Sequence, residues 1–469
     1  MKKLVIILLF AVSIAVFGSR PGDFVRGIPI PALSFTIPAV EKTTNGAVRY
    51  YFFPKEEIPL TSLEISFYGS YDSLKDQPKE IPELLTHVLL YGGSTKHPGA
   101  SLLSELEKIG ARLNISQEYR KVNLTLSFLT EDTEQVLQLL AELLQHPALP
   151  AEAVVSGKKK LKEEIERRNE RTEQIGFRKT RELLLKDYNA GKSYSKESVD
   201  SITDKQLSDF FSFLLQGTSK AVLLHGKYDK KKTTSFLDSL LAAQKEFPGY
   251  AAEEIDYAKL KESAAAIGKN YFVEKEVNQS MVMLSGILPP HNHPDFYAAT
   301  VLNYILGGGS FNSYFMKIIR SEKGLAYTAV SYPSYNRDFG VLYCYALTKA
   351  ESTAEVLQLM REILDEKTVA AISQTELDDA KNAIINKFIF LFNEDSEVIR
   401  NTLRFDEDEM PEGYLENFRK NIGLVSRTDL LRVSKYFLSK NLKTVIVVRK
   451  DVKPEGFVSV DPEQDIGAL

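Results

Sequence analysis

The chain has 469 residues, of which 43% are hydrophobic and 26% charged, and its formal net charge is −4. This composition is typical of a globular protein with more than one domain, and it excludes a disordered or fibrous chain. The acidic balance argues against a nucleic-acid-binding protein, which would need a basic surface. Lysine-rich runs such as GKKKLKEE (157–164) are followed by acidic residues and indicate solvated helix faces.

The N-terminus has the layout of a secretory signal peptide. Two lysines precede an apolar stretch from Leu4 to Phe17, and small residues follow it. We predict a signal peptide over residues 1–18, because the stretch is too short for a comfortable membrane-spanning helix. The mature chain is therefore expected to be periplasmic or secreted, with no stable membrane span after signal removal. An uncleaved N-terminal anchor is the alternative.

The remainder of the chain contains an internal repeat. The leucine-rich segment TEQVLQLLAELLQ begins at Thr133, and the similar segment TAEVLQLMREILD begins at Thr353. Each of these two segments follows a strand-like run, and a helix with a glycine-containing turn precedes that run. Each half of the chain also begins with a further strand. The same order of elements written twice predicts two homologous α+β domains. We place them at 19–247 and 269–469, joined by a linker at 248–268.

Two short segments carry residues of chemical interest. ELLTHVLLYGG begins at Glu83 and reads as the start of an apolar helix. It resembles the inverted zinc motif H-x-x-E-H with two positions replaced. A second pair, His291 and His293 in PPHNHPDF, has a spacing that could bind metal but lies in a proline-flanked loop. The only cysteine, Cys344, alternates with tyrosines in a strand-like run and is predicted to be a small buried residue.

The segment LGGGSFNSYFMKIIRSEKGLAYTAVS (306–331) resembles the second-half signature of the pitrilysin/insulinase family of zinc metallopeptidases, called M16. The resemblance extends over nearly the whole mature chain and includes the twofold repeat. The chain length is similar to that of the short bacterial branch, in which two chains face each other as half-shells. The resemblance implies two homologous α+β domains, each an antiparallel sheet of about six strands flanked by helices.

In active members of the family, the two His of H-x-x-E-H bind zinc, the Glu is the general base, and a later Glu is the third ligand. The resemblance places these positions on Glu83, Thr86 and His87, and the third ligand on Glu163 or Glu164. A threonine hydroxyl cannot take a proton from metal-bound water near neutral pH. We therefore expect no metal, no cofactor and no catalytic residue in this chain. His87 is expected to be a hydrogen-bonded polar residue on a partly buried helix.

The second half departs less from the family pattern. Arg320 and Tyr327 in RSEKGLAY match an Arg/Tyr pair that, in the family, reaches across the chamber to the zinc-bearing half. A guanidinium and a phenol can hold a substrate backbone and stabilise an oxyanion. Gly324 allows the chain to turn between the two residues. Tyr314 stands where the family often has an Arg.

Three functions are compatible with these residues. The leading one is a substrate-binding subunit, inactive alone, of a heteromeric zinc peptidase. A separate M16 chain with an intact H-x-x-E-H would then supply the zinc, and a peptide would be the substrate. The alternatives are a non-enzymatic structural or peptide-binding scaffold protein, and a weak stand-alone metalloendopeptidase with an unusual metal site.

Overall fold

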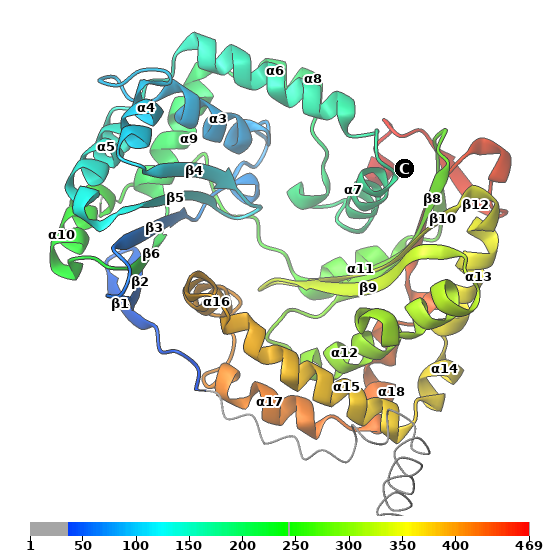
Figure 1. Cartoon of the computed structure of the whole chain (residues 1–469). Coiled ribbons are helices and arrows are strands. Elements are labelled where there is room, and N and C mark those ends of the chain that lie inside the picture. Colours follow the sequence, from blue (N-terminus) through cyan, green and yellow to red (C-terminus); the bar gives the residue numbers. More distant parts are fainter. Residues whose placement is uncertain (1–35, 243, 469) are drawn as a thin grey trace, which may run out of the picture. The chain divides into compact units, whose positions relative to one another are not determined.

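The structure is a computed structural model and describes residues 36–242 and 244–468. The predicted signal peptide at 1–18 lies outside the described residues. Residues from Pro38 to Leu469 form one compact unit, and its elements are shown in Figure 1. No helix in the described part of the chain is both long and apolar enough to cross a membrane.

The strands are β1 (Glu41–Asn45), β2 (Val48–Pro54), β3 (Leu60–Phe67), β4 (Arg112–Gln117), β5 (Val122–Leu129), β6 (Lys220–Gly226), β7 (Asn270–Glu274), β8 (Gln279–Leu288), β9 (Ala326–Tyr335), β10 (Gly340–Lys349), β11 (Lys443–Val448) and β12 (Phe457–Val460). The helices of the first half are α3 (Ile81–Gly92), α4 (Ser101–Lys108), α5 (Thr133–Gln145), α6 (Ala151–Arg167), α7 (Thr172–Leu184), α8 (Lys196–Ser201), α9 (Asp204–Gly217) and α10 (Lys230–Leu241). Later helices are α11 (Tyr257–Ala266), α12 (Phe296–Asn303), α13 (Thr353–Ile363), α14 (Glu366–Ala371), α15 (Gln374–Lys387), α16 (Asp395–Glu407), α17 (Tyr414–Leu424) and α18 (Arg427–Val433).

The sequence repeat is confirmed by the topology of the two sheets. The first six-stranded sheet has the order β1-β2-β6-β3-β5-β4, and the second has the order β12-β7-β11-β8-β10-β9. If the first strand of each order, β1 or β12, is left out, the other five strands follow the same pattern in both sheets. Counted along the chain, they lie in the order first, fifth, second, fourth and third. The repeated leucine-rich segments form α5 and α13, and Val136 and Val356 are both fully buried at equivalent positions. The α+β class and the six strands per sheet are thus as predicted.

The sheets are mixed, whereas the family resemblance implied antiparallel sheets: most pairs are antiparallel, and each sheet also contains parallel pairing. In the first sheet β6 pairs parallel to β2 and antiparallel to β3. In the second, β7 pairs parallel to both β11 and β12. The physical reason is the long helical connection before β6 and before β11, because a crossover of this length lets a strand return parallel to its neighbour.

Each sheet is covered on one face by helices of its own half and contacted by one helix of the other half. The helix α7, from the first half, packs on β8 and β11, and its Ile175 and Leu183 belong to the buried cluster of the second sheet. Conversely, α16 packs on β2 and β6 of the first sheet. Since both faces of β8 are covered, nine of its ten residues are buried, as expected for a nearly continuous apolar strand.

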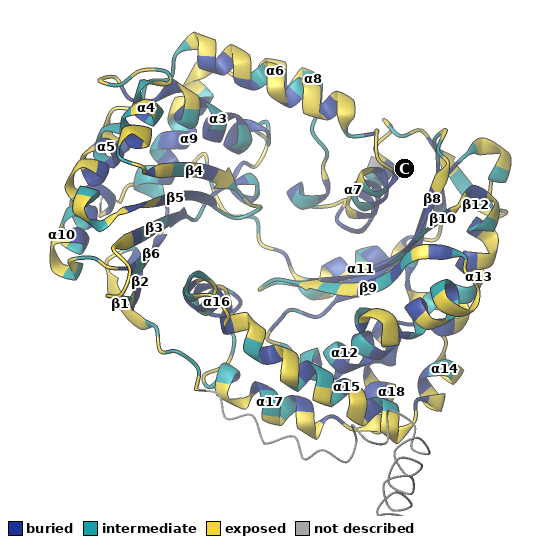
Figure 2. Cartoon of the chain, viewed as in Figure 1, coloured by how far each residue is buried: buried dark blue, intermediate teal, exposed yellow. Residues whose placement is uncertain are grey.

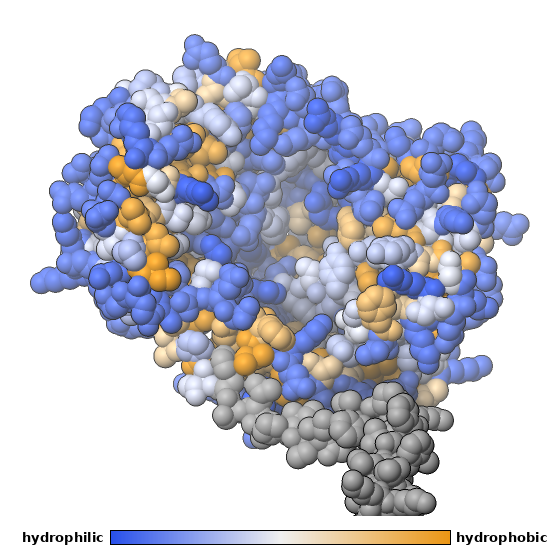
Figure 3. Space-filling model, viewed as in Figure 1, coloured by the Kyte–Doolittle hydropathy of each residue, from blue (hydrophilic) through white to orange (hydrophobic). Residues whose placement is uncertain are grey.

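The predicted linker at 248–268 contains a helix, α11, whose N-terminus is capped by the Asp256 side chain. Ile255 and Leu260 of this segment are buried in a cluster with Leu184 and Val341. Figure 2 shows buried residues along both sheets and exposed residues on the outer faces of helices such as α6. On the face shown in Figure 3, hydrophilic side chains cover most of the surface and apolar ones form separate patches. This is the distribution expected of amphipathic helices packed on sheets.

Candidate functional site

The positions that match the zinc motif lie on α3, as the sequence predicts. Pro82 stands at the helix start and Glu83 in the first turn, which suits the missing N–H of proline and the helix dipole. The partner helix α6 approaches closely because it has a glycine at the crossing. A Cβ at Gly157 would lie 2.6 Å from Leu84 Cδ1 and 2.8 Å from His87 Cδ2. This packing places Glu83 and His87 beside the α6 helix that carries Glu164.

Neighbouring groups occupy the polar atoms at these positions. The hydroxyl of Thr86 is 2.8 Å from the Glu83 backbone carbonyl, to which it donates. Nε2 of His87 shares a hydrogen bond of 3.0 Å with the hydroxyl of Ser156, and its ring lies against Tyr91. Nδ1 of His87 is buried without a partner. The prediction of a hydrogen-bonded polar residue therefore holds for one ring nitrogen and fails for the other.

Lysines of α6 place positive charge beside the positions that match the zinc ligands. Lys160 Nζ lies 3.6 Å from a carboxylate oxygen of Glu164, and Glu163 faces Lys159 at 4.0 Å. Burial lowers the pKa of His87, and the Lys160 charge lowers it further. Burial raises the pKa of Glu83, with a further contribution from Glu164. Both shifts favour the uncharged form of the side chain relative to the same group in water.

The residues present do not fit a catalytic zinc ion. Such a site needs three deprotonated protein ligands that converge on one point. Here a carboxyl replaces one imidazole, Thr86 bonds within its own helix, and the ammonium of Lys160 lies against Glu164. In the described ranges no three His, Cys, Asp or Glu side chains are grouped so as to hold a metal.

Glu83 and Glu164 also line a cavity of about 490 Å³ that no sequence motif indicated. It lies between α3, the C-terminal end of α6, α7 and the segment 189–194. Five basic side chains line it: Lys79, Arg168, Arg178, Arg181 and Lys192. In the sequence these residues are spread over more than a hundred positions, so they form no recognisable cluster. Three tyrosines complete the wall: Tyr71, Tyr119 and Tyr194. The volume is in the range of pockets that take small ligands.

The structure brings Arg320 and Tyr327 together. The Arg320 guanidinium lies 4.5 Å from the centre of the Tyr327 ring and 4.9 Å from the centre of the Phe311 ring. Tyr327 is 76% exposed and Phe311 63% exposed. Two rings on a guanidinium fix its plane through cation–π contacts and leave its N–H edge available for a carboxylate or carbonyl. Phe311 was not predicted from the sequence, because it belongs to no recognised motif and is marked only by its place in the glycine-rich segment.

The backbone around the pair explains its geometry. Arg320 lies in a π-helical segment, Phe315–Glu322, and Gly324 follows with φ of 66°, the left-handed conformation predicted for a turn. The glycines before it allow a close approach to β9, because a Cβ at Gly307 would lie 2.6 Å from the Ser331 backbone nitrogen. Ser310 has φ of 54°, which is rare for a residue other than glycine. Tyr314 donates a 2.8 Å hydrogen bond to Glu376.

Other candidates from the sequence lie apart from these two sites. His291 is buried with Nδ1 at 2.5 Å from Asp408, and His293 Nδ1 accepts from the Asp295 backbone N–H. The two rings therefore do not converge as ligands. Cys344 is fully buried, as predicted, and burial raises the pKa of its thiol.

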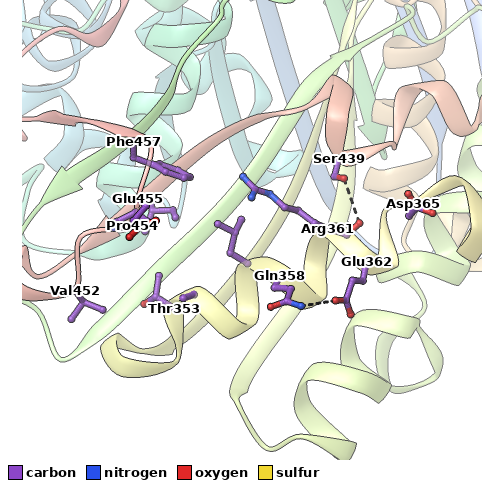
Figure 4. A pocket seen from close by; sticks show the side chains of 13 residues that line it. Thr353, Gln358, Arg361, Glu362, Asp365, Ser439, Val452, Pro454, Glu455 and Phe457 are labelled. Atoms are coloured by element: carbon purple, nitrogen blue, oxygen red, sulfur yellow. Dashed lines mark hydrogen bonds between the residues drawn. The ribbon is translucent and has the colours of Figure 1, made fainter.

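A second cavity, of about 660 Å³, lies beside α13 and the C-terminal segment (Figure 4). Some of its polar side chains bond to one another or to nearby backbone. Gln358 donates to Glu362 at 2.8 Å, and the Ser439 hydroxyl donates to the Arg361 carbonyl at 3.4 Å. None of the residues predicted as a site lines this cavity.

Comparison with known proteins agrees with the fold and the repeat. Residues 78–197 match the model of the insulinase family, peptidase family M16, and residues 201–384 match that of the peptidase M16 inactive domain. A "non-peptidase homolog YmxG" from Helicobacter pylori is 23% identical over 70% of this chain and 74% of its own. An "uncharacterized zinc protease" from Rickettsia felis is 22% identical over 71% of this chain and 81% of its own.

Solved structures show the same fold. A peptidase M16 inactive domain from Pseudomonas fluorescens superposes with a TM-score of 0.74 at 20% identity, covering 88% of this chain and 98% of that one. A protease from Helicobacter pylori gives a TM-score of 0.73 at 18% identity, covering 88% of this chain and all of that one. With two models of the same family matched in series, over residues 78–197 and 201–384, the chain belongs to the M16 peptidase family.

Proposed function

We propose that this chain is the substrate-binding subunit of a heteromeric M16 zinc peptidase and has no hydrolytic activity of its own. The observation that carries the proposal is the contrast between the two halves. The first half has lost two of the positions needed for zinc chemistry, and Thr86 and His87 bond to the Glu83 carbonyl and to Ser156. The second half holds Arg320 between two exposed rings, with its donor edge free to bind a peptide.

The partner in this proposal is an M16 chain with an intact H-x-x-E-H, which would supply the zinc and the general base. Arg320 and Tyr327 would donate to the substrate backbone or to the oxyanion that develops on the scissile carbonyl. The predicted signal peptide supports the same compartment for both chains, the periplasm or the exterior. The relative described as a non-peptidase homolog supports a loss of activity in this part of the family.

Mixing the purified mature chain with an H-x-x-E-H chain of similar length from the same cell tests this function. We expect the two to elute as one complex, and we expect chelator-sensitive hydrolysis of an unstructured peptide only in the mixture. Chelator-sensitive hydrolysis by this chain alone would favour the stand-alone peptidase. A complex that forms but gains no activity over the partner alone would favour the scaffold.

A further inference from the structure

The cavity of about 490 Å³ beside α3 is lined by more basic than acidic side chains. Two of its five basic groups are neutralised within the protein. Arg168 pairs with Glu463 at 2.5 Å, and Arg178 pairs with Glu182 at 3.2 Å. The other three are Lys79, Arg181 and Lys192. None of these three has a carboxylate oxygen within 4.0 Å among the residues that the structure describes.

The two lysines are positioned by one residue. Lys79 Nζ donates to the backbone carbonyl of Asn189 at 3.0 Å, and Lys192 Nζ donates to the side-chain carbonyl of the same residue at 2.9 Å. A neutral carbonyl satisfies one hydrogen bond of an ammonium group but does not balance its charge. Asn189 therefore holds two positive charges at the wall of the cavity, and the Arg181 guanidinium is exposed on the same wall.

Unsatisfied donors are also present in the buried part of the wall. Nε of Arg168 and Nε of Arg178 are buried and have no hydrogen-bond partner. Arg178 is only 9% exposed. A buried N–H group without a partner is costly. Both Nε atoms are closed off from solvent, so the case for an anionic ligand rests on the three unpaired basic side chains of the cavity.

Two carboxyl groups also line the cavity. Glu83 accepts from Gln117 Nε2 at 3.3 Å, and Glu164 is next to Lys160. The three unpaired basic side chains outnumber these two carboxyl groups, so the cavity keeps a positive balance that attracts an anion. Because the wall also contains three tyrosine rings, which can pack against the apolar parts of a peptide, a carboxylate attached to a peptide matches the cavity.

We propose that this cavity binds a peptide carboxylate, with Arg181, Lys79 and Lys192 as the charged groups that recognise it. The choice of a peptide carboxylate as the ligand rests on the proposed function, whereas the anion site follows from the cavity itself. The carboxylate can be an Asp or Glu side chain or a free C-terminus. The position that carries a zinc ligand in active relatives, Glu83, would here lie at the edge of an anion-binding pocket.

The test uses the full mature chain and four dye-labelled alanine pentapeptides. They have Glu or Gln at the central position and a free or amidated C-terminus, and binding is followed by fluorescence anisotropy. At least one carboxylate-bearing peptide should bind about tenfold or more tightly than the Gln peptide with an amide end. Preference for the Glu or for the free end identifies the source. Equal binding of all four peptides, or binding of none, would overturn the proposal.

Variants assign the binding to the cavity. Arg181→Gln should weaken binding of the carboxylate peptide about tenfold or more, and Lys192→Gln should also weaken it. Arg112→Gln is the matched control, an exposed arginine on β4 that does not line the cavity, and it should bind as wild type does. Wild-type binding by a folded Arg181→Gln and Lys192→Gln double variant would refute the site. This binding test does not need the partner chain. If the mixture with the partner hydrolyses peptides but this chain shows no preference for carboxylate peptides, the inference is overturned and the proposed function still stands.

Discussion

At the scale of single residues, the two candidate sites differ in what their polar groups contact. Thr86 and His87 bond to neighbours on α3 and α6, whereas Arg320 lies against two ring faces, and its side chain has no ion pair with the residues that the structure describes. The Arg/Tyr spacing could be read from the sequence. The basic cavity could not, because Lys79, Arg181 and Lys192 are scattered along the chain and form no motif.

Zinc content is predicted to be low. After dialysis, the purified mature chain should retain much less than one zinc ion per molecule, because the donor set at Glu83, Thr86 and His87 does not converge and the Lys160 ammonium lies against Glu164. Elemental analysis is the measurement. A content near one zinc per chain that is lost in the His87→Ala variant would contradict this prediction.

Carboxylate binding should depend on pH through Lys79. Burial, with the charges of Arg181 and Lys192, lowers the pKa of Lys79 to about 7, against the opposing effect of Glu80 and Asp465. A bound carboxylate favours the protonated ammonium and raises this pKa, so the complex takes up a proton above pH 7. Affinity should therefore fall as pH rises from 7 to 8, by at most roughly tenfold per unit for one linked proton.

Titrations at pH 6 and pH 8 check this dependence, and calorimetry in two buffers of different ionisation enthalpy measures the proton uptake. The Lys79→Met variant should bind more weakly and lose the pH dependence. Affinity that is the same at both pH values, with no proton uptake, would show that Lys79 does not contact the ligand.

At the scale of elements, the sequence predicted the repeat well and the packing only in part. The apolar spacing of α5 and α13, with valines at matching positions, could be recognised from the sequence. The crossing of α7 onto the second sheet and of α16 onto the first was not. Helical periodicity shows that a helix has an apolar face, but it does not show which sheet that face covers. The parallel pairing of β6 with β2 could not be predicted either, because the direction and register of a strand are set by tertiary contacts.

The glycine-rich segment before Arg320 should be sensitive to an added methyl group. In Gly307→Ala the Cβ would meet backbone of β9, with the Ser331 nitrogen at 2.6 Å. We expect a loss of about 1–3 kcal/mol in the free energy of unfolding, as for overpacked cores. Gly423→Ala is the control, because its Cβ would meet nothing within 4 Å on exposed α17. It should gain roughly 0.5–1 kcal/mol.

Chemical denaturation of the two variants beside wild type measures both changes. Equal stability of Gly307→Ala and wild type would mean that the segment can move away from β9. In that case the glycines would not be needed to hold the π-helical segment that carries Arg320.

At the scale of the whole molecule, the two halves contact each other through side-chain bonds and through the helices α7 and α16, each of which packs on the sheet of the other half. Arg400 of α16 bonds to Glu64 of β3 at 3.0 Å, and Tyr68 donates to Glu407 at 2.6 Å. Lys121 lies 3.0 Å from Glu407. Under the proposed function the halves have different tasks: the second presents Arg320 and Tyr327 to the partner, and the first carries the basic cavity beside the altered zinc-motif positions.

The central claim is that this chain completes the active site of a partner, and the Arg320→Ala variant tests it most directly. In the mixture with an H-x-x-E-H chain, the variant should still bind the partner but lower kcat/KM by roughly thirty- to thousand-fold, since a lost oxyanion donor costs about 2–4 kcal/mol. Tyr327→Phe should cost less, and Arg112→Ala should leave kcat/KM unchanged. A complex in which Arg320→Ala supports hydrolysis as fast as wild type would contradict the claim.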